Sequence, residues 1–110
     1  MSGLGNKISD IIKRMRLGVL ITDSGYRKMV VPILNAAIRR GDEVNIFLMD
    51  DGCFMSEDPE FVSTVSGKLK VNVCDLNRGQ RNLELPGEIR AGSQYDNISM
   101  VRWCDRLLVF

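Results

Sequence analysis

The sequence contains no histidine among its 110 residues, and its three cysteines show no C-x-x-C spacing. Without an imidazole, no cysteine can form the Cys–His pair of a hydrolytic enzyme. A zinc site would also need further ligands, so we expect no metal. Two options remain for Cys53, Cys74 and Cys104: thiol chemistry at one position, or burial as small apolar side chains.

Aromatic residues are scarce as well, at 6% of the chain, and they are not interleaved with basic residues. This scarcity argues against a nucleic-acid surface. No apolar run approaches the roughly 20 residues of a membrane span, and residues 1–16 lack the long apolar core of a signal peptide. We therefore expect a cytoplasmic protein that has no membrane span and binds no nucleic acid.

The net charge of +1 conceals an uneven distribution along the chain. Residues 1–41 carry eight Lys and Arg against two acids, whereas residues 42–60 carry seven acids and no base. Surfaces of opposite charge favour self-association or a charged partner. Solvated faces on helix ends and loops have the same composition, and the sequence leaves both interpretations open.

The sequence does contain apolar runs that alternate with helical patterns. Runs over residues 17–22, 44–49, 69–74 and 106–110 are apolar on both faces and predict buried strands. A chain of this length forms one domain. We predict an α/β fold with a mainly parallel sheet covered on both sides, over residues 17–110. Residues 1–16 are predicted to form an amphipathic helix or a flexible lead-in.

Helices are predicted between these strands. The turn at residues 23–25 offers an N-cap for a helix that runs to Arg40 and ends at Gly41. Pro32 either kinks this helix or lies in its first regular turn. Asp58 caps a second, short helix, with Pro59 at its first position and Gly67 just past its end. Residues 78–92 are predicted as packed turns. A last helix begins at Ser93 or Asp96. Its inward-facing residues are expected to be Ile98, Val101 and Cys104.

Cys74 closes the third predicted strand, so its thiol is expected at the edge where the carboxyl ends of parallel strands meet. Arg78 follows four residues later, with Gly79 beside it. Nearby positive charge favours the reactive thiolate, which makes Arg78 a candidate partner. Gly79 would allow a tight turn beside the sulfur. The alternative is that Cys74 is a buried strand-end residue and Arg78 caps a helix.

The segment Asp50-Asp51-Gly52-Cys53 follows the second strand and belongs at the same edge. The two carboxylates could form a metal-binding or phosphoacceptor pair. The better interpretation is a loop that ends the strand and frames the pocket near Cys74. In that loop, Cys53 is either a second thiol or a packed small residue. The turn at residues 22–25 lacks the glycine pattern of a dinucleotide site and the hydroxyl density of a flavin phosphate loop, so no cofactor is expected.

Three stretches, taken in order, resemble the DsrE/DsrF-like family, which includes the TusD-type sulfur-relay subunits and the YchN-like proteins. They are Ala36 to Gly52, Cys74 to Gly79, and Glu88 to Ser93 followed by the last helix and Asp105 to Phe110. The resemblance covers roughly residues 17–110. No single motif is strong, and the order and spacing together carry the similarity.

The resemblance implies a flavodoxin-like, three-layer fold with a five-stranded, mainly parallel sheet. It also implies trimers or hexamers, and a cysteine that carries sulfane sulfur as a persulfide. Cys74 and Arg78 would then be the reactive pair, and Asp51, Gly52, Cys53 and Gly79 would surround them. The expected partners are copies of the same chain and sulfur donor or acceptor proteins. A non-catalytic subunit of such an oligomer is the alternative.

Overall fold

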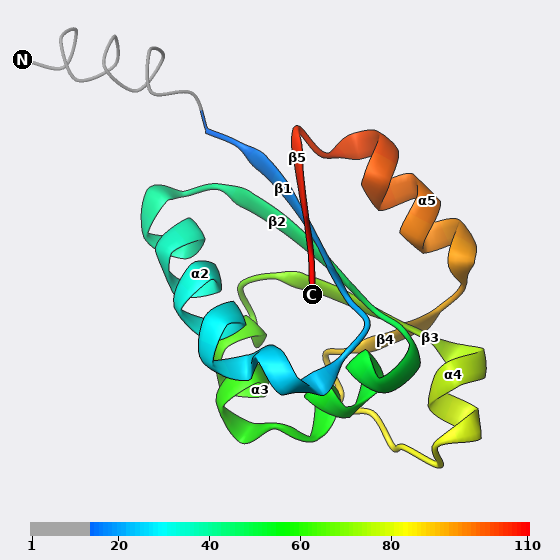
Figure 1. Ribbon diagram of the computed structural model, residues 1–110. Helices are drawn as coiled ribbons and strands as arrows, with labels where there is room; N and C mark the ends of the chain where they lie inside the picture. Colours follow the sequence, from blue (N-terminus) through cyan, green and yellow to red (C-terminus); the bar gives the residue numbers. More distant parts are fainter. Residues whose placement is uncertain (1–13) are drawn as a thin grey trace, which may run out of the picture.

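Five parallel strands form one sheet in the computed structural model, which describes residues 14–110 (Figure 1). The spatial order is β4-β3-β2-β1-β5, and every neighbouring pair is parallel. The predicted α/β class and parallel sheet are therefore confirmed. The amphipathic helix or flexible lead-in predicted for residues 1–16 falls mostly on residues 1–13, which lie outside the described part of the chain. The strands are β1 (Arg16–Ile21), β2 (Glu43–Leu48), β3 (Lys70–Cys74), β4 (Arg90–Gly92) and β5 (Arg106–Val109).

Helices cover both faces of this sheet (Figure 1). The helices α2 and α3 pack side by side on one face, and α5 lies over β1 and β2 on the other. Two further elements, η2 and α4, lie at the carboxyl edge of the strands. Among residues 14–110, no helix is both long and apolar enough to cross a membrane. The helical elements are η1 (Ser24–Tyr26), α2 (Arg27–Arg40), η2 (Asp50–Glu57), α3 (Pro59–Val65), α4 (Asp75–Gln80) and α5 (Gln94–Trp103).

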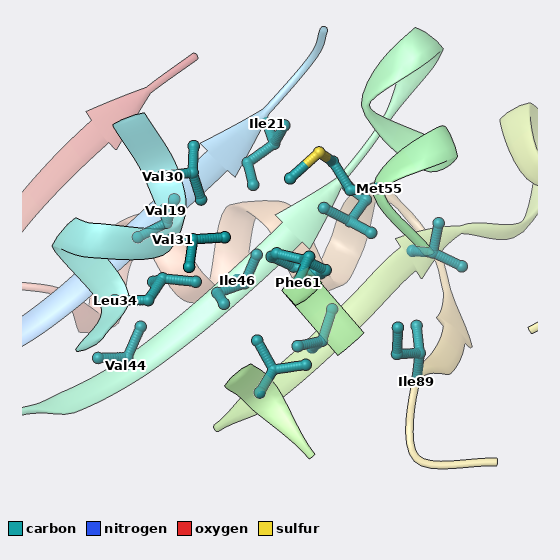
Figure 2. Close-up of a cluster of buried hydrophobic side chains, with 14 of the residues drawn as sticks. Val19, Ile21, Val30, Val31, Leu34, Val44, Ile46, Met55, Phe61 and Ile89 are labelled. Carbon is teal, nitrogen blue, oxygen red and sulfur yellow. The ribbon is translucent and has the colours of Figure 1, made fainter. Parts of the chain in front are cut away.

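The main apolar cluster lies between the sheet and the α2–α3 layer (Figure 2). Alternate residues of β1 point into it, as the two-residue period of a strand requires. Each fully buried aliphatic or aromatic side chain contributes roughly 1.5–3 kcal/mol of hydrophobic stabilisation. This cluster is thus the main source of the fold's stability. Its most deeply buried members include Val19, Ile21, Leu34, Ile46, Leu48, Phe61 and Val73.

A smaller cluster lies on the α5 face. Phe47, Cys74 and Met100 are buried there, and Leu20 and Met49 pack against them. Residues on β1 and β5 that face the same way are less well covered, because α5 is the single described helix on this face. Cys74 therefore belongs to the smaller of the two clusters.

The helix α2 continues through Pro32 from Arg27 to Arg40. Asp23 caps the turn η1 that leads into it, by accepting a hydrogen bond from the Gly25 N–H (3.1 Å). The helix ends where Gly41 adopts φ +76°, a left-handed conformation that glycine tolerates best. The predicted stop at Gly41 is confirmed. The predicted N-cap is wrong in detail, because Asp23 caps η1 whereas α2 begins at Arg27, and Pro32 lies in the sixth position and not in the first turn.

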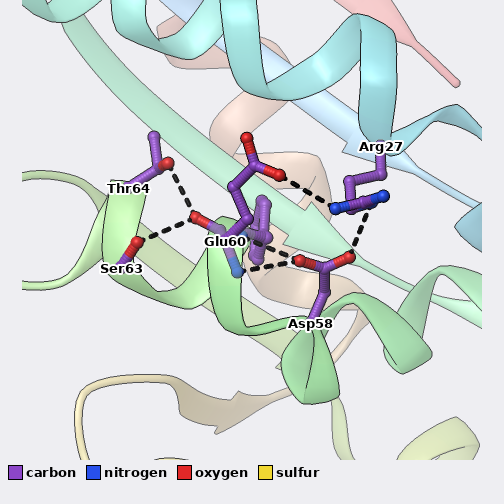
Figure 3. A network of polar contacts seen from close by, with 6 residues as sticks. Arg27, Asp58, Glu60, Ser63 and Thr64 are labelled. Carbon is purple, nitrogen blue, oxygen red and sulfur yellow. Dashed lines mark hydrogen bonds and ion pairs between the residues drawn. The ribbon is translucent and has the colours of Figure 1, made fainter.

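Part of the uneven charge is neutralised within the chain (Figure 3). Arg27 of α2 contacts Asp58 at 3.1 Å and Glu60 at 2.8 Å, and Asp58 also caps α3 through the backbone N–H groups of Glu60 and Phe61. These contacts join the basic helix to the acidic segment that follows β2. These ion pairs therefore link α2 to the start of α3.

The segment from 78 to 110 differs from expectation in two places. The strand β4 has only three residues, too few to show a two-residue period, and the sequence pattern did not locate it. The helix α5 does begin after Ser93, whose capping box with Asp96 is complete. Its predicted inward face is wrong, because Ile98 (52% exposed) and Val101 (44% exposed) point outward and Met100 is the buried residue.

Candidate functional site

The thiol edge, which we define as Asp50 to Cys53 together with Cys74 to Arg81, lies where β2 and β3 end. Cys74 is the last residue of β3 and occupies the N-cap position of α4. It is 5% exposed and packs with Phe47 and Met100. The parallel register places Cys74 next to Gly92 of β4. The structure thus places this thiol at the predicted edge, in a buried position.

Cys53 is fully buried in η2, where its Sγ donates to the carbonyl oxygen of Leu48 at 3.9 Å. Burial raises the pKa of the Cys53 thiol to about 11, Arg81 opposes this increase, and charges on Cys74 and Asp50 add to it. The two thiols belong to different apolar clusters, Cys53 to the main one and Cys74 to the smaller one. Cys53 remains protonated at neutral pH.

Gly52 lies against the end of β1. A Cβ at this position would overlap the backbone carbonyl of Ile21, so only glycine allows η2 to approach the strand this closely. Asp50, two residues earlier, has φ +49°, which is uncommon for a residue other than glycine. Gly52 thus fixes the loop that carries Cys53 on the sheet.

Arg78 lies on α4, and its guanidinium is engaged locally. Its Nε and Nη2 contact Asp75 at 2.8 and 2.7 Å, and its Nη1 donates to the carbonyl oxygen of Leu83 at 2.8 Å. These contacts join the first residue of α4 to the segment that follows the helix. Gly79 lies within the same helix, and nothing lies within 4 Å of the position that a Cβ would take.

Arg81 is a residue of the edge that the sequence analysis did not single out. Its Nε and Nη2 both lie 3.0 Å from Oδ1 of Asp51, and its Nη1 donates to the carbonyl oxygen of Asn77 at 3.1 Å. Asp51 is therefore one half of an ion pair. Asp51 lies thirty positions away in the chain, so no local spacing pointed to Arg81.

The described residues offer no metal cluster: among residues 14–110, no group of three or more Cys, Asp or Glu side chains lies close enough to hold an ion. Cys104, the third cysteine, is half-buried at the end of α5, and its Sγ donates to the Val101 carbonyl oxygen at 3.5 Å. Its side chain lies next to Gly18 of β1 and is not part of the thiol edge.

A groove of about 420 Å³ runs beside α5 over the beginnings of β2 and β3. Its lining mixes charged, polar and aromatic side chains, and the sequence analysis did not anticipate it. The groove is separate from the thiol edge, because β2 and β3 begin at the opposite end of the sheet. Its residues include Glu43, Asn45, Lys70, Asp96, Ser99 and Trp103.

Comparisons with known proteins identify a fold and no family. No family model matches the sequence, and neither does any curated protein. The crystal structure of the YchN protein from E. coli superimposes with a TM-score of 0.69 and covers 89% of this chain and 100% of its own, at 14% sequence identity. At that identity the likeness establishes the fold alone, and it confirms the expected flavodoxin-like arrangement.

Proposed function

We propose that this chain is a DsrE-like protein of intracellular sulfur metabolism that carries sulfane sulfur as a persulfide on Cys74. The observation that supports this proposal best is the position of Cys74, at the carboxyl end of β3 and at the N-cap position of α4. The fold shared with YchN and the resemblance of the sequence to the DsrE/DsrF-like family are consistent with it.

The proposed step needs neither an oxidant nor a histidine. The Cys74 thiolate attacks the outer sulfur of a donor persulfide, R–S–SH. A new S–S bond forms at Cys74, the donor's own S–S bond breaks, and the donor leaves as the thiolate R–S⁻. Delivery to an acceptor thiolate is the same exchange in reverse, so atoms, charge and electrons balance at each stage.

The surroundings of the two thiols support Cys74 as the carrier. Phe47, Met100, Leu20 and Met49 surround Cys74 with apolar side chains, which suits a weakly hydrated outer sulfur. Burial raises the pKa of Cys53 to about 11, so its thiolate fraction is smaller than that of an ordinary cysteine at any given pH. A thiol is a much weaker nucleophile than a thiolate, so Cys53 does not compete for the sulfur.

Intact-mass analysis after incubation with a low-molecular-weight persulfide tests the proposal. We expect the wild-type protein to gain the mass of one sulfur atom and to lose it on addition of a reducing thiol. Cys74→Ser abolishes the gain, whereas Cys104→Ser serves as the matched control and retains it. Equal loading of Cys74→Ser and the wild type would contradict the assignment.

A second candidate function, as a non-catalytic subunit of a homo-oligomer, is favoured by a different observation. The apolar α5 face, defined here as Ile98, Val101, Leu107 and Val109, is exposed, and Val109 reaches 58% exposure. Leu107 and Val109 pair with Gly18 and Leu20 of β1, so all four strand residues face the same side. A second copy that covers this face would remove it from water.

The mass of the protein in solution tests this second candidate. We expect a trimer or hexamer for the wild type and a smaller species for Val109→Asp, because a charge on this face must be desolvated upon association. Glu84→Gln, a substitution outside the apolar α5 face, serves as the control. A monomeric wild-type protein would exclude the assembly role and leave the sulfur-carrier test unaffected.

A further inference from the structure

The helix α5 is too narrow to cover the sheet face on which it lies. A helix with its side chains is about 10–12 Å wide, whereas five strands spaced by about 4.8 Å span about 19 Å. The flank over β1 and β5 carries the apolar α5 face. The flank over the beginnings of β2 and β3 is the groove of about 420 Å³, and polar side chains line it. The two open flanks therefore differ in chemistry.

Polar side chains occupy alternate positions on the groove side of β3. Cys74 packs with Met100 of α5, so Asn72 and Lys70, at two-residue steps before it, face the same side of the sheet. A Cβ at Gly92 would meet both the Asp96 carboxylate and the Cβ of Asn72. Asn72 therefore lies between Lys70 and Asp96, two residues that line the groove.

Asn72 is only 7% exposed, although it is polar. Its side-chain amide makes no hydrogen bond to another of residues 14–110, and it is not sealed from solvent. A buried polar group without a protein partner is costly unless water or a ligand bonds to it. The amide is thus available to a molecule in the groove.

Opposite charges line the groove without pairing with each other. Lys70 lies beside Asn45 in the register of β2 and β3, and Glu43 lies two residues before Asn45, about 6.6 Å along the strand. Within residues 14–110, no ion pair joins Lys70 to Glu43 or Asp96. Asp96 already accepts a hydrogen bond from the Ser93 N–H at 2.8 Å. Lys70 and Glu43 are therefore the positive and negative groups that face the groove without a described partner.

Trp103 contributes an aromatic wall from α5. The guanidinium of Arg16 lies 5.9 Å from the centre of the Trp103 ring and also pairs with Asp105 at 3.5 Å. Arg16 is thus already engaged outside the groove. The indole ring supplies an apolar surface beside the charged floor.

We propose that this groove binds a small zwitterion of the α-amino acid class with an apolar side chain. The ammonium group of the ligand contacts Glu43, its carboxylate contacts Lys70, and its side chain lies against Trp103. A singly charged ligand leaves one of the two protein charges without a partner, so the zwitterion binds more tightly. The groove lies within the volume range of small-molecule sites, about 300–1,000 Å³. It lies at the opposite end of the strands from Cys74 and does not depend on thiol chemistry.

Fluorescence of Trp103 in the full-length protein tests the site, because the chain contains one tryptophan. L-Leucine is compared with two analogues that keep its isobutyl group: 3-methylbutylamine, which lacks the carboxylate, and 4-methylpentanoate, which lacks the ammonium group. We expect a saturable change with L-leucine and about tenfold weaker binding of each analogue, because each loses one charge-assisted contact.

Two variants assign the contacts. Lys70→Met should remove the preference for L-leucine over 3-methylbutylamine, and Glu43→Gln should remove the preference over 4-methylpentanoate. Lys68→Met is the matched control, because Lys68 precedes β3 and lies outside the groove, and it should leave binding unchanged.

Two results with the wild-type protein would overturn the proposal, and neither needs a variant. One is the absence of a saturable change with L-leucine up to about 10 mM. The other is an analogue that binds as tightly as L-leucine, which would mean that the groove does not recognise both charges. Persulfide loading is read by mass, so failure of either proposal is seen separately.

Discussion

On one face of the sheet, α2 and α3 cover a continuous apolar cluster that contains Phe61 and the fully buried thiol of Cys53. On the other face, α5 covers a smaller cluster that contains Phe47 and the thiol of Cys74, and apolar residues beside it are exposed. The two faces thus each hold one buried phenylalanine and one buried cysteine in different settings. The difference suggests that the first face supplies stability, whereas the second leaves room for exchange and association.

The two phenylalanines give the largest test of this comparison. Phe61→Ala should reduce the free energy of unfolding by about 3–5 kcal/mol, because the dense α2–α3 layer cannot collapse into the cavity (Figure 2). For Phe47→Ala, the loss in free energy of unfolding should be at or below the lower end of that range, because α5 is the one helix that has to move into the cavity. Denaturant titration of the two variants measures the difference, and equal losses would break the comparison.

The two thiols give the next test, through the pH dependence of stability. The pKa of Cys53 is raised to about 11 from 9.0, so the folded state keeps its proton where the unfolded state loses it. Stability should therefore fall as pH rises from 9.0 towards about 11, by at most about 1.4 kcal/mol per pH unit. Denaturant titrations across this window should show a shallower fall for Cys53→Ala. Identical slopes in the two proteins would mean that Cys53 is not held neutral by the core.

Two glycines give the smallest test. Gly52→Ala should cost about 1–3 kcal/mol, because the added methyl group overlaps the backbone of β1 and forces η2 away from the sheet. Gly79→Ala lies in open space on α4 and should be neutral or stabilising by up to about 1 kcal/mol. Thermal unfolding of the pair measures the contrast. A neutral Gly52→Ala would show that η2 is not anchored on the α2–α3 side.

Much of the fold could be predicted because its signals are local. Apolar runs marked four of the five strands, and Asp58, Gly41 and Ser93 marked helix ends through hydrogen bonds to near neighbours. The strand β4 was not located, since three residues carry no periodicity and the pairing with β3 is what defines it. The inward face of α5 was assigned wrongly because apolar residues occur on more than one side of that helix.

The candidate site was predictable only in part. Strand-end position correctly placed Cys74 and the segment from Asp50 to Cys53 at one edge. Sequence proximity favoured Arg78 as the partner of the thiol, yet its guanidinium contacts Asp75 and Leu83. Arg81 reaches Asp51 across thirty positions in the chain, and no local pattern encodes that contact.

The sequence by itself determined the class of this protein: the period of its apolar residues requires parallel strands with covering helices, and the absence of histidine removes Cys–His catalysis. Only the tertiary structure decided which face each thiol occupies, which arginine contacts the loop after β2, and which apolar residues stay exposed. Those outcomes depend on how separate elements pack, because a side chain's surroundings are set by residues distant in the chain. Cys74 has its position from the strand and its cover from side chains of β1, β2 and α5.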